Sequence, residues 1–167
     1  MTAFLAPARW LLAAIVVSAA MLATAHGFET FAHLPPCELC LRQREVYWTA
    51  LGVAAAGIVA QRLWPRTGLA SFACVLLALV FLAGATVAAY HAGVEWKWWP
   101  GPTACSGGSH RHLSAADMTS VLSGAKQTFV RCDVAAWRMF GLSMAGWNVL
   151  VSLGLAGASV LAAVRRR

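Results

Sequence analysis

Residues 69–90 read LASFACVLLALVFLAGATVAAY, an apolar run without a single charged side chain. A run of this length can cross the roughly 30 Å hydrocarbon core of a bilayer as an α-helix. Comparable runs lie on both sides of it, at residues 10–27, 46–64 and 145–164. The sequence therefore predicts an all-α integral membrane protein, a four-transmembrane-helix bundle that forms one membrane domain over residues 1–167.

The composition supports this fold class. Hydrophobic residues make up 60% of the chain and charged residues only 11%. In soluble domains, about a quarter of all residues are charged. A water-soluble core could not absorb so much apolar surface. The triplet Ala23-Thr24-Ala25 at the end of the first run also fits the cleavage site of a secretory signal, but we expect this helix to be retained as an anchor.

The charged side chains predict the orientation of the bundle. All six carboxylates fall in two long connecting segments, residues 28–45 and 91–144. The remaining short segments contain basic residues and no acid: Arg9, Arg62, Arg66, Arg165, Arg166 and Arg167. By the positive-inside rule, both termini face the cytoplasm and the two long segments are periplasmic loops.

The net charge of +7 does not indicate nucleic-acid binding. Six basic residues are explained by topology, and the other seven are nearly balanced by the six acids. We expect the terminal arginines at 165–167 to contact anionic lipid headgroups instead.

The chain has five cysteines, and four of them fall in the predicted outer loops: Cys37, Cys40, Cys105 and Cys132. Outside the cytoplasm thiols tend to oxidise, so an even set there predicts disulfides. Cys74 lies inside the apolar run at 69–90. We interpret it as an inert packing residue, because lipid disfavours the thiolate that reactivity requires.

Cys37 and Cys40 form a C-x-x-C motif directly after Pro36. A proline just ahead of a helical pattern is a start signal, so the pair is expected in the first turn of a helix, where free N–H groups stabilise a thiolate. Such a motif can also be half of a zinc site. The two downstream cysteines are not paired at zinc-site spacing, so we expect no metal.

Arg44 lies four residues after Cys40 and therefore shares its helical face. It could simply reach toward the membrane surface and pair with Glu45 or Glu38. Alternatively, its guanidinium could stabilise a Cys40 thiolate and an anion beside it, such as a partly reduced quinone oxygen. The helix N-terminus favours charge on Cys37 and Arg44 favours charge on Cys40, and the sequence leaves this choice open.

The other two outer cysteines, Cys105 and Cys132, belong to the long loop. A disulfide closing it could be a structural staple that contributes about 3 to 4 kcal/mol. The tryptophans and glycines around Cys105 favour an accessible sulfur close to the membrane instead. Between the two cysteines, apolar residues recur at helical spacing and predict a short amphipathic helix on the membrane: Leu113, Met118, Val121, Leu122 and Ala125.

Several motifs together resemble the disulfide bond formation protein B family: PCELCLRQR at 36–44, Tyr90-His91, PGPTAC at 100–105, and Cys132 before the last helix. The resemblance implies a quinone-linked oxidoreductase of the bacterial inner membrane. Such an enzyme reoxidises a DsbA-like, thioredoxin-fold periplasmic oxidase by thiol–disulfide exchange and passes the electrons to ubiquinone or menaquinone.

The resemblance also implies a role for each site residue. Cys37 and Cys40 would be the quinone-coupled pair, with Cys40 facing the quinone. Cys105 would be attacked by the reduced partner and Cys132 would resolve the mixed disulfide. Arg44 would bind the quinone. His91 would lie beside it, although the Trp-rich segment that follows departs from the family pattern.

Two other functions fit the same residues. In a vitamin K epoxide reductase-like enzyme, the same four helices and cysteine pairs would carry electrons in the opposite direction. In a non-enzymatic membrane scaffold, both disulfides would be structural. Quinone reduction driven by a reduced thioredoxin-fold partner distinguishes these hypotheses.

Overall fold

The computed structural model describes residues 6–65, 67–102 and 131–165. Within those ranges, four helices are long and apolar enough to span a membrane: α1 (Pro7–Phe31), α2 (Glu38–Leu63), α3 (Leu69–Glu95) and α5 (Met144–Val164). The predicted all-α, four-helix membrane bundle is confirmed. The predicted amphipathic helix around residues 113–125 lies outside the described residues.

The helices are longer than the apolar runs that predicted them. The 27 residues of α3 extend about 40 Å at 1.5 Å per residue, which exceeds the roughly 30 Å hydrocarbon core. α2 begins at Glu38 rather than at residue 46, and α3 continues past residue 90 to Glu95. Hydropathy identifies only the apolar part of a helix, which contacts lipid. It does not detect polar turns that continue the same helix. Arg44 and His91 consequently lie on helices, not in loops.

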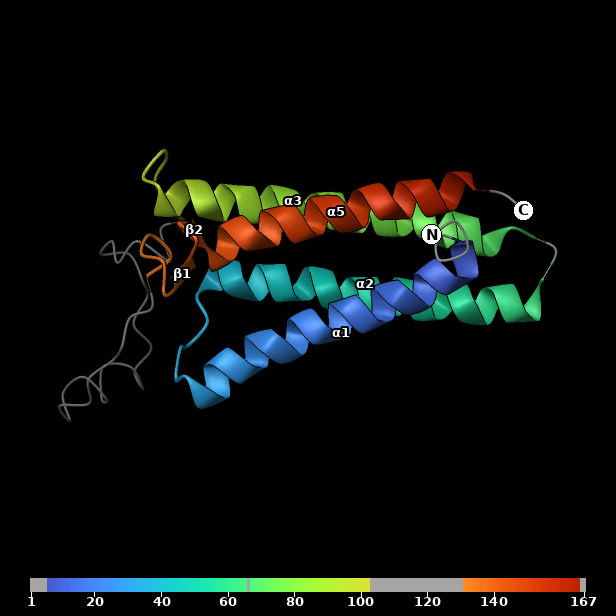
Figure 1. The fold of residues 1–167 in the computed structure, drawn as a ribbon, viewed down its shortest axis with the longest axis horizontal. Coiled ribbons are helices and arrows are strands. Elements are labelled where there is room, and N and C mark those ends of the chain that lie inside the picture. The colour runs from blue at the N-terminus through green and yellow to red at the C-terminus, as the bar shows by residue number, and fades with distance from the viewer. Residues whose placement is uncertain (1–5, 66, 103–130, 166–167) are drawn as a thin grey trace, which may run out of the picture.

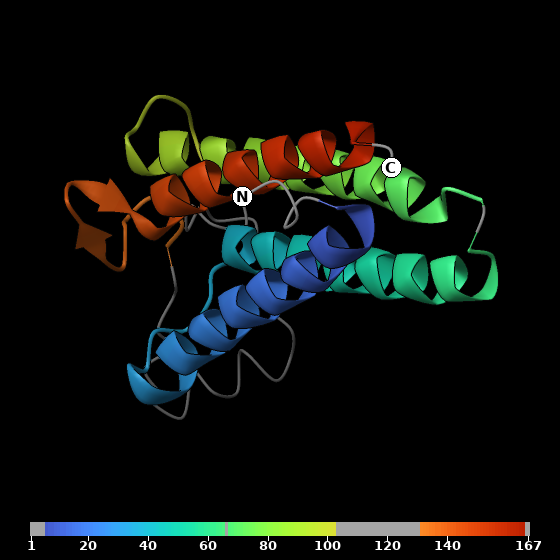
Figure 2. The ribbon, with the colours of Figure 1, turned by 45° about the vertical axis from the view of Figure 1, so that its right-hand side comes forward.

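The other three helices are arranged around α3, which packs most extensively against α5 and α2. α1 packs mainly on α2, and Figures 1 and 2 show it diverging from α2 toward its own C-terminal end. Both described chain ends and the α2–α3 connection lie at one end of the bundle, and the C-x-x-C motif lies at the other (Figure 1). We call the latter the cysteine end.

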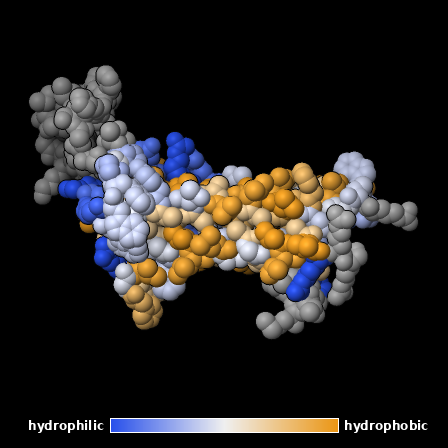
Figure 3. Space-filling model, turned by 90° about the horizontal axis from the view of Figure 1, so that it is seen from above, coloured by the Kyte–Doolittle hydropathy of each residue, from blue (hydrophilic) through white to orange (hydrophobic). Residues whose placement is uncertain are grey.

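Small residues allow the helices to approach closely. A Cβ placed on Gly57 of α2 would lie 2.5 Å from the Cβ of Ala73 on α3, so no larger residue fits at this crossing. Large side chains fill the remaining space, with Leu11, Leu77 and Phe81 fully buried. Figure 3 shows that hydrophobic side chains cover the middle of the molecule and hydrophilic ones gather toward its ends, as expected for a bundle surrounded by lipid.

A short hairpin leads into the last helix. Strands β1 (Arg138–Met139) and β2 (Leu142–Ser143) pair antiparallel, and the connecting Phe140 and Gly141 have φ angles of 51° and 81°. Two consecutive residues with positive φ define a type I′ turn, the connection that matches strand twist. Ser143 then caps α5 by accepting a hydrogen bond from the Gly146 amide at 3.2 Å. This hairpin was not among the predicted elements, and it fixes the path from Cys132 to α5.

Candidate redox site

The C-x-x-C motif begins α2. Cys37 is the N-cap residue, with extended backbone angles of −78° and 171°, and its Sγ accepts a hydrogen bond from the Cys40 amide at 3.2 Å. Pro35 and Pro36 precede it, and the residue before a proline is disfavoured in helical conformation, so the helix starts here. The two sulfur atoms therefore lie on one helical turn, as the sequence predicted.

The two sulfurs are in contact. Cys37 and Cys40 are free thiols whose Sγ atoms lie 2.6 Å apart, within easy reach of the roughly 2.05 Å bond of a disulfide. The side-chain hydrogen bond with Cys40, together with burial, raises the pKa of the Cys37 thiol well above its ordinary value. When the pair is reduced, the proton therefore stays on Cys37.

The third sulfur of the site comes from the far end of the long loop. Cys132 is only 1% exposed and packs in one buried cluster with Cys37, Leu39 and Val94. It is disulfide-bonded. Cys105 lies outside the described residues, so its predicted pairing with Cys132 stays a prediction. The cluster nevertheless brings one cysteine of each predicted pair together.

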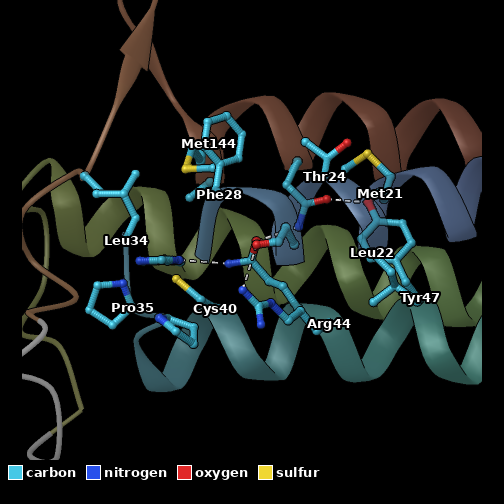
Figure 4. Close-up of a pocket in the computed structure, with 17 residues that line it drawn as sticks. Met21, Leu22, Thr24, Phe28, Leu34, Pro35, Cys40, Arg44, Tyr47 and Met144 are labelled. Atoms are coloured by element: carbon cyan, nitrogen blue, oxygen red, sulfur yellow. Dashed lines mark hydrogen bonds between the residues drawn. The ribbon is translucent and has the colours of Figure 1, made fainter. Parts of the chain in front are cut away.

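A cavity of about 170 Å³ adjoins the other side of the motif. Cys40, Arg44 and His91 line it together with mainly apolar side chains from α1, α2 and α5. Figure 4 shows Cys40 and Arg44 on one side of the cavity, and Phe28 of α1 with Met144 of α5 on the other. The cavity lies where α1 diverges from α2. It therefore joins the cysteine motif to the space between these two helices.

Arg44 has a partner that sequence reasoning missed. Its guanidinium donates to the Glu29 carboxylate at 2.6 Å and to the Ala25 carbonyl at 3.1 Å, both on α1. Among the described residues, Arg44 forms no ion pair with the expected partners Glu45 and Glu38. Glu45 pairs instead with Arg42 at 3.2 Å. Arg44 is thus fixed between α1 and α2 beside the cavity. Glu29 offered no signal because its helix was predicted to end at residue 27.

His91 is held by a series of buried polar side chains. The Gln43 amide nitrogen lies 2.8 Å from His91 Nδ1, and the Asn148 amide donates to Gln43 Oε1 at 2.5 Å. Tyr47 donates in turn to Asn148 Oδ1. We refer to Tyr47, Asn148 and Gln43 as the polar relay. Its signal in the sequence was Asn148, a polar residue within an apolar span, since such residues are usually functional or paired.

A buried carboxyl completes the surroundings of His91. Glu95 lies one turn further along α3, is only 8% exposed, and places Oε1 at 3.8 Å from His91 Nε2. Its other oxygen has no hydrogen-bond partner among the described residues. The i,i+4 spacing of His91 and Glu95 would have indicated this contact had the predicted helix extended past residue 90.

Three of these groups have the composition of a metal site. The ligand atoms of Cys37, Cys40 and His91 lie within 4.8 Å of one another. Two thiolates bound at about 2.3 Å to a tetrahedral zinc are about 3.8 Å apart, whereas these sulfurs are separated by 2.6 Å. The arrangement fits a redox-active pair better than a zinc ligand set.

Comparison with known proteins gives matches to proteins of disulfide bond formation. A family model described as disulfide bond formation protein DsbB matches residues 7–162. Disulfide bond formation protein B of Azoarcus sp. (strain BH72) is 30% identical over 139 residues, which cover 83% of this chain and 81% of that relative. No solved structure matches the chain.

Proposed function

This chain belongs to the disulfide bond formation protein B family of membrane proteins, and from that premise we propose that it oxidises a DsbA-like, thioredoxin-fold periplasmic dithiol and passes the electrons to a membrane quinone. One observation carries the proposal. Cys37 packs against Cys132 of the loop, while Cys40, on the same helical turn, faces a cavity that also contains Arg44.

The sulfur chemistry proceeds by successive exchange reactions. A thiolate of the partner attacks Cys105 of the loop disulfide, and Cys132 leaves as a thiolate. The partner's second thiolate, rather than Cys132, resolves the mixed disulfide, because attack by Cys132 would only return the partner in its reduced form. This step releases the oxidised partner and a reduced loop pair. Cys132 then attacks Cys37 of the oxidised motif and Cys40 leaves; Cys105 closes the loop disulfide again. Two electrons have then reached Cys37 and Cys40.

The assignment of Cys40 as the cavity-facing thiolate follows from two features. The proton of the reduced pair stays on Cys37, so the negative charge falls on Cys40. Arg44 lies one turn further along α2 and lines the same cavity. The hydrogen bond within the pair and the arginine beside the cavity thus both favour the negative charge on Cys40.

The cavity fits the ring of a quinone. A dry cavity of about 150 Å³ is large enough to hold benzene, and this one has about 170 Å³ with a mainly apolar lining. A quinone bound there would supply the acceptor for two electrons and two protons. The guanidinium of Arg44 would donate a hydrogen bond to a ring oxygen, and Glu29 on α1 would hold that guanidinium in place.

The orientation of the bundle supports a periplasmic cysteine end in the bacterial inner membrane. Arg9, Arg62 and Arg165 belong to the opposite end, where both described chain ends lie (Figure 1). Basic residues there favour the cytoplasmic side. The cysteines then face the compartment in which disulfides persist and thioredoxin-fold oxidases act.

The test is a reconstituted reaction. Purified protein is mixed with a reduced thioredoxin-fold oxidase and ubiquinone or menaquinone, and quinone absorbance is followed during turnover. We expect catalytic quinone reduction in the wild type and none in Cys40→Ser. A structural scaffold would give no turnover with any donor, which would refute the proposal. Equal turnover with any general thiol reductant would favour the vitamin K epoxide reductase-like alternative.

A further inference from the structure

The polar relay connects three helices and lines the cavity proposed for the quinone. It has no part in the sulfur exchange described above. Tyr47 and Gln43 come from α2, Asn148 from α5, and His91, at which the relay ends, from α3. All four side chains are buried, with exposures of 9% or less. Buried polar groups in a membrane protein are costly unless they are fully hydrogen-bonded, so such a series calls for a function beyond packing.

The hydrogen bonds of the relay have one direction. A tyrosine hydroxyl that donates to Asn148 Oδ1 leaves the Asn148 amide nitrogen as the donor toward Gln43. Gln43 accepts with Oε1, so its own amide nitrogen faces His91 Nδ1 at 2.8 Å. An amide nitrogen only donates. Nδ1 must therefore accept, and the proton of the neutral imidazole lies on Nε2.

The groups on the far side of the imidazole agree with this tautomer. Nε2 faces Glu95 Oε1 and Cys37 Sγ, each at 3.8 Å. A proton on Nε2 can be donated to either group, and 3.8 Å is within hydrogen-bonding distance of a sulfur. His91 thus presents its N–H to Cys37, the motif sulfur that packs with Cys132.

We propose that Tyr47, Asn148 and Gln43 are positioning residues that hold His91 in its Nε2-protonated tautomer, so that the Nε2–H of His91 orients Cys37 Sγ, the sulfur that Cys132 attacks. The inference rests on the proposed exchange between the two cysteine pairs and adds the device that aligns them. No proton or electron moves through the relay. Its contribution is geometric, since exchange requires Cys37 Sγ to be held in line for attack by Cys132.

The test reverses the direction of the hydrogen bonds in the relay without replacing His91. In Asn148→Asp, a carboxylate oxygen replaces the amide nitrogen that faces Gln43. The Gln43 amide must then turn its nitrogen toward Asp and its oxygen toward Nδ1, which moves the imidazole proton to Nδ1. Gln43→Glu makes the same change directly at Nδ1 and serves as a second variant if the first does not fold. Ser159→Ala is the matched control, because Ser159 is also buried on α5 but is bonded to Trp10.

Two readouts separate this proposal from the function on which it rests. Nitrogen-15 NMR, with His91 assigned by a His91→Gln variant, should show a protonated Nε2 in the wild type and in Ser159→Ala, and a protonated Nδ1 in Asn148→Asp. Single-turnover exchange between the loop pair and the C-x-x-C pair should slow by about tenfold or more in Asn148→Asp. A wild type protonated at Nδ1, or normal exchange in a variant with the shifted tautomer, would overturn the proposal. A wild type with the expected tautomer that never oxidises a partner would refute the proposed function alone.

Discussion

Cys37 and Cys40 lie on the same helical turn, yet their surroundings differ. Cys37 is 5% exposed and packs with Cys132, Leu39 and Val94, on the side where the loop arrives. Cys40 is less buried and faces the cavity that Arg44 also lines. We refer to these as the loop side and the cavity side. A helix N-terminus thus gives two neighbouring sulfurs different partners. Under the proposed function, electrons would enter on the loop side and leave on the cavity side.

The largest effect is expected from removing Cys105, the loop cysteine that the partner attacks in the proposed reaction. Cys105→Ala should abolish oxidation of the partner, because the disulfide that the partner attacks can no longer form. Quinone binding should persist, since the cavity side is unchanged. Partner oxidation is measured by thiol quantification and quinone binding by titration of the purified variant. Unimpaired partner oxidation would remove Cys105 from the pathway.

Arg44→Ala should impair the reaction with quinone on the cavity side and leave thiol–disulfide exchange on the loop side unchanged. We expect the apparent quinone KM to rise, or turnover to fall, by about tenfold or more, with each decade equivalent to about 1.4 kcal/mol. Arg44→Lys should recover activity only partly, because an ammonium lacks the planar fork. Steady-state quinone reduction gives the comparison, with partner exchange in a single turnover as the measure of the loop side.

Arg42→Ala is the matched control for Arg44, because Arg42 lies on the same helix and pairs with the exposed Glu45. It should leave quinone kinetics unchanged. If Arg44→Ala behaves like Arg42→Ala, Arg44 contributes only to the contact between α1 and α2 that it makes through Glu29.

The smallest effect is expected at Asp133, next to Cys132 on the loop side. Hydrogen bonds from Arg131 and Lys97 hold its pKa well below the usual range of an aspartate. A lowered folded-state pKa gives stability that is present above the unfolded pKa of about 3.9 and is lost as the pH falls through the folded value. Asp133→Asn should therefore lower the thermal midpoint at neutral pH by no more than about 4 °C.

This difference between Asp133→Asn and the wild type should narrow as the pH falls below about 4, and thermal unfolding at several pH values checks it. Both basic partners are largely exposed, with side-chain exposures of 60% and 61%, so solvent screens the interaction. A midpoint difference that is constant down to low pH would exclude the carboxylate charge as its cause.

The fold was predictable because its main signal is local. Each helix needed an apolar run long enough for lipid, and all four runs identified real helices. The ends of the helices were less predictable, because polar turns such as those around Arg44 and Glu95 continue a helix without an apolar signal. The hairpin at Phe140 and Gly141 was missed, since Phe140 is not among the residues that usually mark such a turn.

The candidate site was predictable only where its residues are close in sequence. Cys37, Cys40 and Arg44 share one short motif, so helical periodicity places them together. Glu29, Asn148 and Glu95 reach the site from three other helices, and their contacts depend on how the bundle packs. Periodicity along one chain carries no information about which helices become neighbours, so these partners required the structure.

The divergence of α1 from α2 has a consequence for how the enzyme would meet its electron acceptor. A molecule with a long hydrocarbon tail would enter the cavity sideways from the lipid, and water would not be its route. The relevant concentration of the electron acceptor is then its mole fraction in the bilayer, because the protein encounters only acceptor molecules that are dissolved in the membrane. Adding empty lipid to proteoliposomes should slow quinone reduction, whereas adding buffer should not. Rates of quinone reduction measured in different membranes therefore become comparable only when the quinone concentration is expressed per lipid molecule.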